Sequence, residues 1–252
     1  MRRRQPAVET TLGCEMQAGR SNTAVTETAA KNFASATRIQ ESVTSGLERK
    51  ALLWLAVRMP SWVTSDQLTL LGFVAMFLAG CSYLSARWHP VGLLLATACL
   101  ALNWFGDSLD GTLARVRNRQ RPRYGFYVDH IVDSLGALFL MTGLGLSGYV
   151  DWRIAMCMLI AFLLLSIETY LASYTLGIFR LSFAHFGPTE IRILLALSNL
   201  VLWCRPNIRA PVGLSWRLLD FAGVIATTVM GVMVIVAALW HTVELYRRET
   251  LP

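Results

Sequence analysis

Residues Gly106–Ser134 read GDSLDGTLARVRNRQRPRYGFYVDHIVDS, and this stretch lies between two of the most apolar runs of the chain. It contains five arginines, one histidine and four aspartates, and the aspartates are Asp107, Asp110, Asp129 and Asp133. The rest of the chain avoids charge, because only 15% of its 252 residues are Asp, Glu, Lys or Arg. Such a concentration of carboxylates next to apolar segments therefore points to a chemical role.

The aspartates recur at helical spacing, with small residues and an arginine beside them. At about 100° per residue, one helical face collects Asp107, Asp110, Gly111, Ala114 and Arg115. A second face collects Gly125, Asp129 and Asp133, which are four residues apart. The connection between the two segments is short, so we expect antiparallel neighbouring helices whose faces oppose each other near one end.

Four converging carboxylates would repel one another unless positive charge neutralised them. Oxygen ligands of this kind suit Mg²⁺, Mn²⁺ or Ca²⁺, and the neighbourhood offers none of the thiolates that favour zinc. Gly111, Ala114 and Gly125 would let a flat base or a phosphate approach the helix backbone, which a larger side chain would block. The stretch therefore predicts a site for divalent metal and a phosphate compound.

The composition predicts an all-α integral membrane protein. Hydrophobic residues make up 54% of the chain, more than a soluble domain of this size buries. A segment that crosses about 30 Å of hydrocarbon must satisfy its own backbone hydrogen bonds, so apolar runs of this length are helices. Six transmembrane helices are expected, over about Leu68–Ala86, Pro90–Asn103 continuing toward Asp107, Phe126–Tyr149, Ile154–Ser173, Ile191–Cys204 and Leu218–Trp240.

The net charge of +7 is interpreted as membrane topology and not as binding of nucleic acid. Nine Lys and Arg precede the first predicted span, five Arg separate the second from the third, and Arg247 and Arg248 follow the last. With six spans, these three regions share one face, which the positive-inside rule assigns to the cytoplasm. The aspartates lie on that face, so the site is expected to open to the cytoplasm.

Four regions are expected along the chain. Residues 1–45 resemble a disordered cytoplasmic tail, because they are polar and lack a sustained period. Residues 46–60 predict an amphipathic helix at the membrane interface, too short to span and ending before Pro60. Residues 61–246 are expected to form one membrane domain, whose first helix Thr64 or Ser65 can cap, with Gln67 three residues after Thr64 completing a capping box. Residues 247–252 are expected to form a short cytoplasmic tail.

The pattern Asp107-x-x-Asp110-Gly111-x-x-Ala114-Arg115, followed after nine residues by Gly125-x-x-x-Asp129-x-x-x-Asp133, resembles the signature of the CDP-alcohol phosphotransferase family. All eight fixed positions are present. Ser65–Thr69 is similar to a Pro-Asn-x-Ile/Leu-Thr turn of the family, with Ser and Asp in place of Pro and Asn. Gly187-Pro188-Thr189-Glu190 is similar to a Gly-Pro-x-Glu region of eukaryotic choline and ethanolamine phosphotransferases.

The resemblance implies six transmembrane helices, a homodimer, and an enzyme of phospholipid synthesis. In the implied reaction, the hydroxyl of an acceptor alcohol attacks a CDP-linked alcohol donor at its β-phosphorus and CMP is released. Carried over by position, Asp107, Asp110 and Asp129 become ligands of two Mg²⁺ or Mn²⁺ ions, and Asp133 becomes a ligand and the general base. The contacts to the cytidine and its phosphates would come from Gly111, Ala114, Arg115 and Gly125.

Several alternatives stay open. The donor could be CDP-diacylglycerol with a polar acceptor, which the compact size favours, or a CDP-amino alcohol with diacylglycerol as acceptor, which the Gly-Pro-x-Glu likeness favours. A divalent-cation transporter would also cluster carboxylates in a membrane, but it has no need of the interleaved Gly, Ala and Arg. Arg180 and Arg192 could bind an acceptor phosphate and Glu190 a cationic headgroup, or they could merely anchor the interface. Five charged residues flank the fourth loop and are functional candidates in this way: Glu168, Arg180, His185, Glu190 and Arg192.

Two further interpretations concern residues inside the quoted stretch. Arg117, Arg119, Arg121 and Arg123 are expected to set topology and contact lipid headgroups and not to take part in chemistry. His130 is expected to point away from the face that carries Asp129 and Asp133, and to have a structural role.

Overall fold

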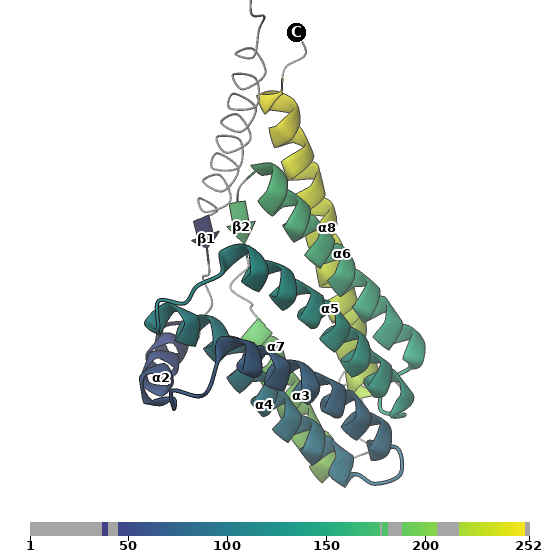
Figure 1. The fold of residues 1–252 in the computed structure, drawn as a ribbon. Helices are drawn as coiled ribbons and strands as arrows, with labels where there is room; N and C mark the ends of the chain where they lie inside the picture. The colour runs from purple at the N-terminus through teal and green to yellow at the C-terminus, as the bar shows by residue number, and fades with distance from the viewer. Residues whose placement is uncertain (1–36, 40–44, 177, 181–187, 206–216, 250–252) are drawn as a thin grey trace, which may run out of the picture.

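A computed structural model describes residues 37–39, 45–176, 178–180, 188–205 and 217–249. Within this part of the chain there are seven helices and two three-residue strands (Figure 1). The helices are α2 Ser45–Arg58, α3 Ser65–Ala86, α4 Val91–Val116, α5 Pro122–Leu146, α6 Trp152–Leu176, α7 Pro188–Cys204 and α8 Leu218–Arg248. The strands β1 (Thr37–Ile39) and β2 (Ile178–Arg180) pair in parallel.

Five of the described helices, α3, α4, α5, α6 and α8, are long and apolar enough to cross a membrane. The protein is therefore an integral membrane protein with a helical membrane domain. Each of the six predicted apolar segments falls on one helix, and the observed helices extend beyond most predicted ends. The fifth predicted segment, Ile191–Cys204, corresponds to α7, whose 17 residues cover about 25 Å at the usual rise of an α-helix.

Helix α3 is the centre of the packing, since it lies against both α4 and α5. Its close approach to α5 depends on glycine. A Cβ atom on Gly143 of α5 would lie 2.0 Å from the carbonyl oxygen of Gly80 on α3, which no side chain tolerates. The backbones can touch there only because neither position carries a side chain, so this crossing fixes α5 against α3.

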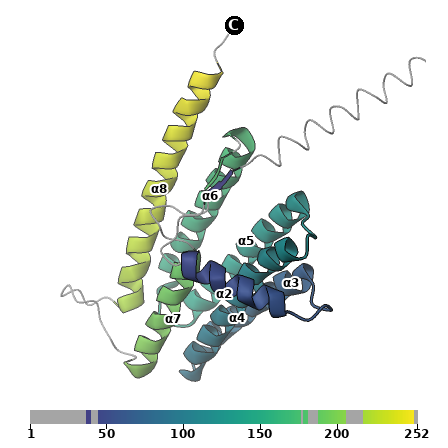
Figure 2. The same ribbon diagram turned by 90° about the vertical axis from the view of Figure 1, so that its left-hand side faces the viewer.

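Helix α2 lies across α4 on the outside of this group (Figure 2). Leu52 and Ala56 of α2 are buried in a small core with Leu109 and Leu113 of α4. On its other side α2 exposes Leu53, Trp54 and Val57. The predicted helix over residues 46–60 is thus present, and one side of it is packed on the end of α4 that carries the aspartates.

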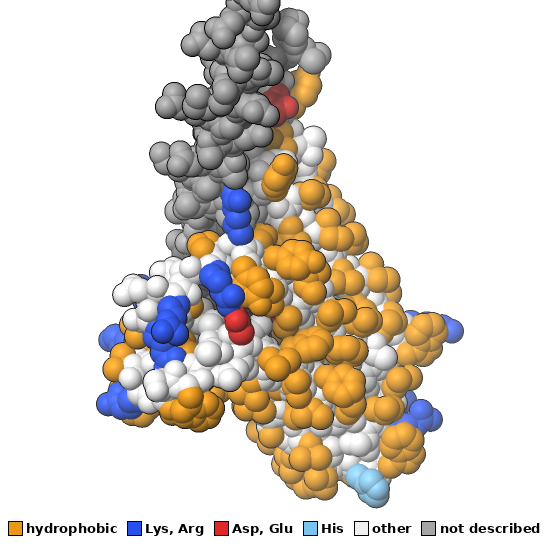
Figure 3. Space-filling model, in the orientation of Figure 1, with side chains coloured by type: hydrophobic (Ala, Val, Ile, Leu, Met, Phe, Trp, Pro, Cys, Tyr) orange, Lys and Arg blue, Asp and Glu red, His pale blue; other side chains and the backbone are white. Residues whose placement is uncertain are grey.

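Helix α8 packs against α6 at the opposite side of the molecule (Figure 2). Hydrophobic side chains cover most of the face drawn in Figure 3, and Lys and Arg lie mainly toward its edges, most of them on the side of α2. This separation of apolar and basic surface agrees with a bundle whose sides lie in lipid and whose one end lies among headgroups.

The predicted cytoplasmic tail, residues 1–45, lies mostly outside the described residues. Within the stretch assigned to that tail, Thr37–Ile39 form β1, which pairs with β2. Strand pairing joins backbone groups, so three residues can pair without any apolar period in the sequence. The predicted capping box is confirmed: Gln67 N–H donates to Thr64 Oγ1, and Gln67 Oε1 accepts from the Thr64 N–H.

Candidate active site

Asp110 of α4 is held by two hydroxyls of α3. Thr69 Oγ1 donates to Asp110 Oδ2 at 2.5 Å, and Ser65 Oγ donates to the Asp110 carbonyl oxygen at 2.9 Å. The capped first turn of α3 presents both hydroxyls, because Ser65 and Thr69 are four residues apart on one helical face. The Ser65–Thr69 segment therefore orients a carboxylate of the aspartate cluster, despite its departure from the family's turn.

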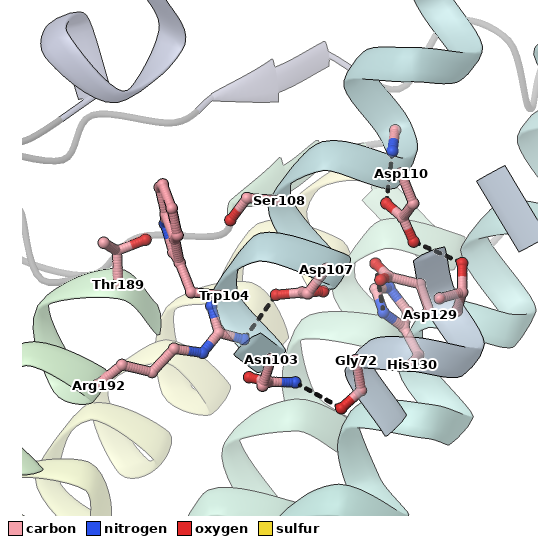
Figure 4. Close-up of polar contacts among 12 residues, drawn as sticks. Gly72, Asn103, Trp104, Asp107, Ser108, Asp110, Asp129, His130, Thr189 and Arg192 are labelled. Carbon is pink, nitrogen blue, oxygen red and sulfur yellow. Dashed lines mark hydrogen bonds and ion pairs between the residues drawn. The ribbon is translucent and has the colours of Figure 1, made fainter. Parts of the chain in front are cut away.

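Asp107, one turn earlier on α4, forms an ion pair with Arg192 of α7 (Figure 4). The distance between Arg192 Nη2 and Asp107 Oδ2 is 2.5 Å, and the side chains are only 14% and 24% exposed. A partly desolvated pair of this kind is stronger than a surface pair. Arg192, one of the five candidates that flank the fourth loop, thus reaches the aspartate cluster itself.

The second pair of aspartates comes from α5, together with a histidine. Single ligand atoms of Asp129, His130 and Asp133 all lie within 4.8 Å of one another. Contrary to the sequence-based expectation, His130 does not point away from this group, since its Nδ1 lies 3.7 Å from Asp129 Oδ2. Its buried ring also stacks on Tyr170 of α6 at 4.3 Å. That stacking partner, distant in sequence, turns the ring toward the site.

The two aspartate helices converge, although not by direct packing along their length. The Asp133 carboxylate interacts electrostatically with Asp107, Asp110 and Asp129, and with Arg192. We expected α4 and α5 to be direct neighbours, but α5 packs mainly against α3 and α6, and α3 joins the two helices. The α3–α4 and α3–α5 crossings explain why α4 and α5 do not pack directly against each other. Glycines at these crossings let both helices approach the backbone of α3 closely.

Gly111 and Gly125 face open space. Within the part of the chain that the structure describes, a Cβ atom built on either glycine would meet nothing within 4 Å, and both residues are exposed. Ala114 is partly buried and Arg115 is exposed, with Arg115 Nη2 3.1 Å from Thr112 Oγ1. The surface beside the aspartates thus has room for a ligand, with an arginine at its edge.

Two of the loop arginines hold the neighbouring connection in place. Arg117 donates to the carbonyl oxygens of Met59, Pro60 and Val63, which join α2 to α3. Arg121 forms an ion pair with Asp66, both of whose carboxylate oxygens lie 2.5 Å from Arg121 Nη2. Arg117 was expected to contact headgroups, and its three backbone partners instead make it a cap for the loop.

Sequence reasoning missed several residues of this region. Ser65 and Thr69 could have been found from their likeness to the family's turn. No sequence pattern around Glu48, Trp104 or Tyr170 marks them as neighbours of the site, where Glu48 accepts from Trp104 and Tyr170 stacks on His130. Glu168 of α6, one of the five candidates that flank the fourth loop, forms a pair with His241 of α8, with Oε1 2.5 Å from Nδ1. His185 and the side chain of Arg180 lie outside the described residues.

Comparison with known proteins gives a family match and two relatives. Residues 58–242 match the family described as CDP-alcohol phosphatidyltransferase. The chain is 31% identical over 113 residues to an archaetidylinositol phosphate synthase of Pyrococcus horikoshii, which is 45% of this chain and 53% of the relative. It is 27% identical over 158 residues to cholinephosphotransferase 1 of Gallus gallus, covering 59% of this chain and 46% of the relative.

The chain thus spans about half the length of each of these curated relatives. The family match covers far more than half of the chain, and it includes every element that contributes to the aspartate cluster. The protein belongs to the CDP-alcohol phosphatidyltransferase family.

Proposed function

We propose that this protein is a membrane enzyme of phospholipid synthesis that transfers a substituted phosphate from a CDP-linked alcohol to an acceptor hydroxyl and releases CMP. The observation that carries the proposal is the convergence of four carboxylates from α4 and α5 next to two glycines that face open space. Carboxylates hold metal and the open space accommodates the donor. The family membership supports the same reaction class.

The donor set fits divalent metal. Asp129, His130 and Asp133 can each bring one ligand atom to a common point, and Asp107 and Asp110 lie on the facing helix. We propose that Asp107, Asp110, Asp129 and Asp133 hold two Mg²⁺ or Mn²⁺ ions. When bound, such ions polarise phosphoryl oxygens and stabilise the charge that grows on the leaving CMP.

Asp107 is engaged by Arg192 and Asp110 by Thr69, so the two ligands on α4 are already oriented by partners from α7 and α3. Such partners fix the direction of a carboxylate before a cation binds and preserve its charge. Arg192 also supplies one positive charge to four carboxylates, which lowers their mutual repulsion. Both effects keep the cluster assembled.

The open face around Gly111 and Gly125 is proposed to hold the cytidine and its phosphates. Ala114 continues the face one turn further along α4, and Arg115 offers a guanidinium that grips phosphate oxygens in bidentate fashion. A backbone without side chains allows a planar base to lie close to the helix. The leaving group would therefore be oriented by α4 and the first turn of α5.

Asp133 is proposed to take the proton of the acceptor hydroxyl as well as to bind metal. An alcohol is a poor nucleophile at neutral pH, so a carboxylate must lie within hydrogen-bond reach of it. Asp133 is the most deeply placed of the α5 pair along the helix and is in electrostatic contact with the other three aspartates. It is thus the carboxylate best placed to serve both metal and acceptor.

We propose CDP-diacylglycerol as donor and a polar alcohol as acceptor. The relative from Pyrococcus horikoshii is named an archaetidylinositol phosphate synthase, and that name supports a polar alcohol as the acceptor. The second candidate is transfer from CDP-choline or CDP-ethanolamine to diacylglycerol. The longer match to a cholinephosphotransferase, and the likeness at Gly187–Glu190, favour that candidate.

The membrane arrangement completes the proposal. With α7 as a sixth, short span, the basic ends of the bundle share one side, and the aspartate cluster opens to the cytoplasm. Helix α2 would lie at that interface with Trp54 and Val57 toward lipid, and Arg58 stacks over the Trp54 ring at 4.1 Å. The enzyme is proposed to act as a homodimer.

The test uses purified protein with each class of CDP-alcohol and acceptor, and CMP release is measured. CMP release should vanish in excess chelator and return with Mg²⁺ or Mn²⁺, because the proposed ligands are hard oxygen donors. Undiminished turnover in chelator would contradict the metal site. Uptake of Mn²⁺ into proteoliposomes without any CDP-lipid would instead favour the transporter reading.

A further inference from the structure

Glu48 of α2 forms a junction between three helices beside the aspartate cluster. Its Oε1 accepts from Trp104 Nε1 at 2.8 Å, from Thr189 Oγ1 at 3.0 Å, and from Ser108 Oγ at 3.4 Å. Trp104 and Ser108 belong to α4, and Thr189 belongs to α7. One carboxylate oxygen therefore joins elements that are 141 residues apart in sequence.

The junction lies directly beside the ion pair of the site. On α4, Asp107 follows Trp104 by three residues, and on α7, Arg192 follows Thr189 by three residues. Residues three apart lie on the same side of a helix, so the partners of Glu48 and the ion pair share one side of α4 and one side of α7. Figure 4 shows Trp104, Ser108 and Thr189 beside the Asp107–Arg192 pair. Helices α4 and α7 are thus linked twice within one turn, by Glu48 and by Arg192.

The position of Glu48 also suits the start of α7. Thr189 is the second residue of that helix, where backbone N–H groups lack helical acceptors and the helix dipole is positive. A carboxylate there favours the helix start at this place. Glu48 therefore fixes both the side and the end of α7 from which Arg192 extends.

We propose that Glu48 is a positioning residue that holds the first turn of α7, and so keeps Arg192 on Asp107. It touches no reacting atom, and it acts by keeping the cation of α7 in register with the carboxylate of α4. The interfacial helix thereby becomes part of the active-site support. This inference rests on the proposed function for its kinetic effect, but not for the placement of Arg192.

The first test reads Arg192 directly. Labelling by phenylglyoxal, followed by mass spectrometry, measures how readily each guanidinium reacts, and the ion pair should protect Arg192. Glu48→Ala should raise Arg192 labelling severalfold, whereas Glu48→Gln, which keeps an acceptor oxygen, should restore most of the protection. Glu244→Gln is the matched control, since Glu244 pairs with Arg248 on α8 and should alter only Arg248.

Thr189→Val isolates the link to α7. It removes the hydroxyl at nearly constant shape, leaves the Trp104 link in place, and should also raise Arg192 labelling. This variant decides the question if Glu48→Ala does not fold. Wild-type protection of Arg192 in Thr189→Val, or in folded Glu48→Ala, would overturn the proposal.

The second test is a double-mutant cycle on kcat/KM with Arg192→Lys. Glu48→Ala should lower kcat/KM about tenfold, the usual worth of a hydrogen bond to a charged group. The double variant should lose little more than Arg192→Lys alone, because both changes disturb one ion pair. Additive losses would overturn the positioning role. A wild-type protein without any CMP release would refute the proposed function, while Arg192 labelling would still decide the role of Glu48.

Discussion

Gly106 and Gly111 lie on the same helix, α4, yet Gly106 packs closely against a neighbouring helix and Gly111 does not. A Cβ atom on Gly106 would lie 2.6 Å from the Leu68 carbonyl oxygen and 2.7 Å from the Gly72 nitrogen of α3. A Cβ atom on Gly111 would meet nothing within 4 Å. The glycine at 106 is thus explained by packing, whereas no contact among the described residues explains the glycine at 111.

The difference separates a closed side of α4 from an open side. On the closed side the buried residues Asn103, Gly106, Leu109 and Leu113 pack the helix, and Asn103 Nδ2 donates to the Gly72 carbonyl oxygen. On the open side the chain keeps its residues small without filling the space. Space that a protein preserves without packing it is the expected property of a ligand surface.

The largest effect is expected on the closed side. Gly106→Leu should prevent folding, because the new side chain would overlap the α3 backbone, which cannot move without separating α3 from α4. Overpacking against side chains costs about 1–3 kcal/mol, and overlap with backbone costs more. Size-exclusion chromatography in detergent should show aggregate instead of a single folded species. A folded, active variant would contradict the closed side.

Gly111→Leu is the matched change on the open side. The variant should fold normally, since leucine is a good helix former and a Cβ atom at this position meets no described atom within 4 Å. Binding of the CDP moiety should nevertheless be lost, because the side chain would fill the proposed donor space. Calorimetric titration with CDP-diacylglycerol measures this, with Ala114→Leu as a second variant of the same face. Unchanged donor affinity in the folded protein would place the donor elsewhere.

Asp133→Asn sharpens the open side chemically. Asparagine keeps the size and one coordinating oxygen but cannot take a proton, so donor should still bind while transfer falls by about 10²–10⁴. Asp107→Asn removes charge from the metal site and the partner of Arg192, and should weaken Mn²⁺ and donor binding together with turnover. Turnover near that of the wild type in Asp133→Asn would assign the base to another residue.

The parts of the structure that depend on local spacing could be predicted from sequence. Helical periodicity gave the shared faces of Asp107 with Asp110 and of Asp129 with Asp133, and apolar runs gave every described helix of the membrane domain. The capping box of Thr64 and Gln67 is likewise a pattern of four residues. In each case the energy that decides the structure comes from neighbours along the chain.

The parts that depend on tertiary packing could not be predicted. Arg192 meets Asp107 across 85 residues, and Glu48 meets Ser108 across 60, and no periodicity encodes such pairs. The role of α3 as the link between α4 and α5 follows from how closely glycine-bearing backbones approach, which only the packed structure reveals. The predicted orientation of His130 was wrong for the same reason, because stacking on Tyr170 of α6 sets the direction of its ring.

The smallest effect is expected where the closed side supports the open side. Thr69 Oγ1 reaches both Asp110 Oδ2, at 2.5 Å, and the Ser65 carbonyl oxygen, at 3.1 Å, but its hydroxyl has one hydrogen to donate. Of the two acceptors, the charged Asp110 carboxylate is closer and forms the stronger hydrogen bond. Thr69→Val keeps the shape of the side chain and removes the hydrogen-bond donor, so the Asp110 carboxylate should lose its fixed orientation. The Mn²⁺ affinity and kcat/KM should then each fall about tenfold. Thr69→Ser should restore both. Thr228→Val on α8, where the hydroxyl donates only to the Val224 carbonyl oxygen, controls for the change of residue type. Equal losses in the two valine variants would show that Thr69 stabilises its helix without orienting Asp110. Helix α3 would then only pack against the closed side of α4 and would not support the open side.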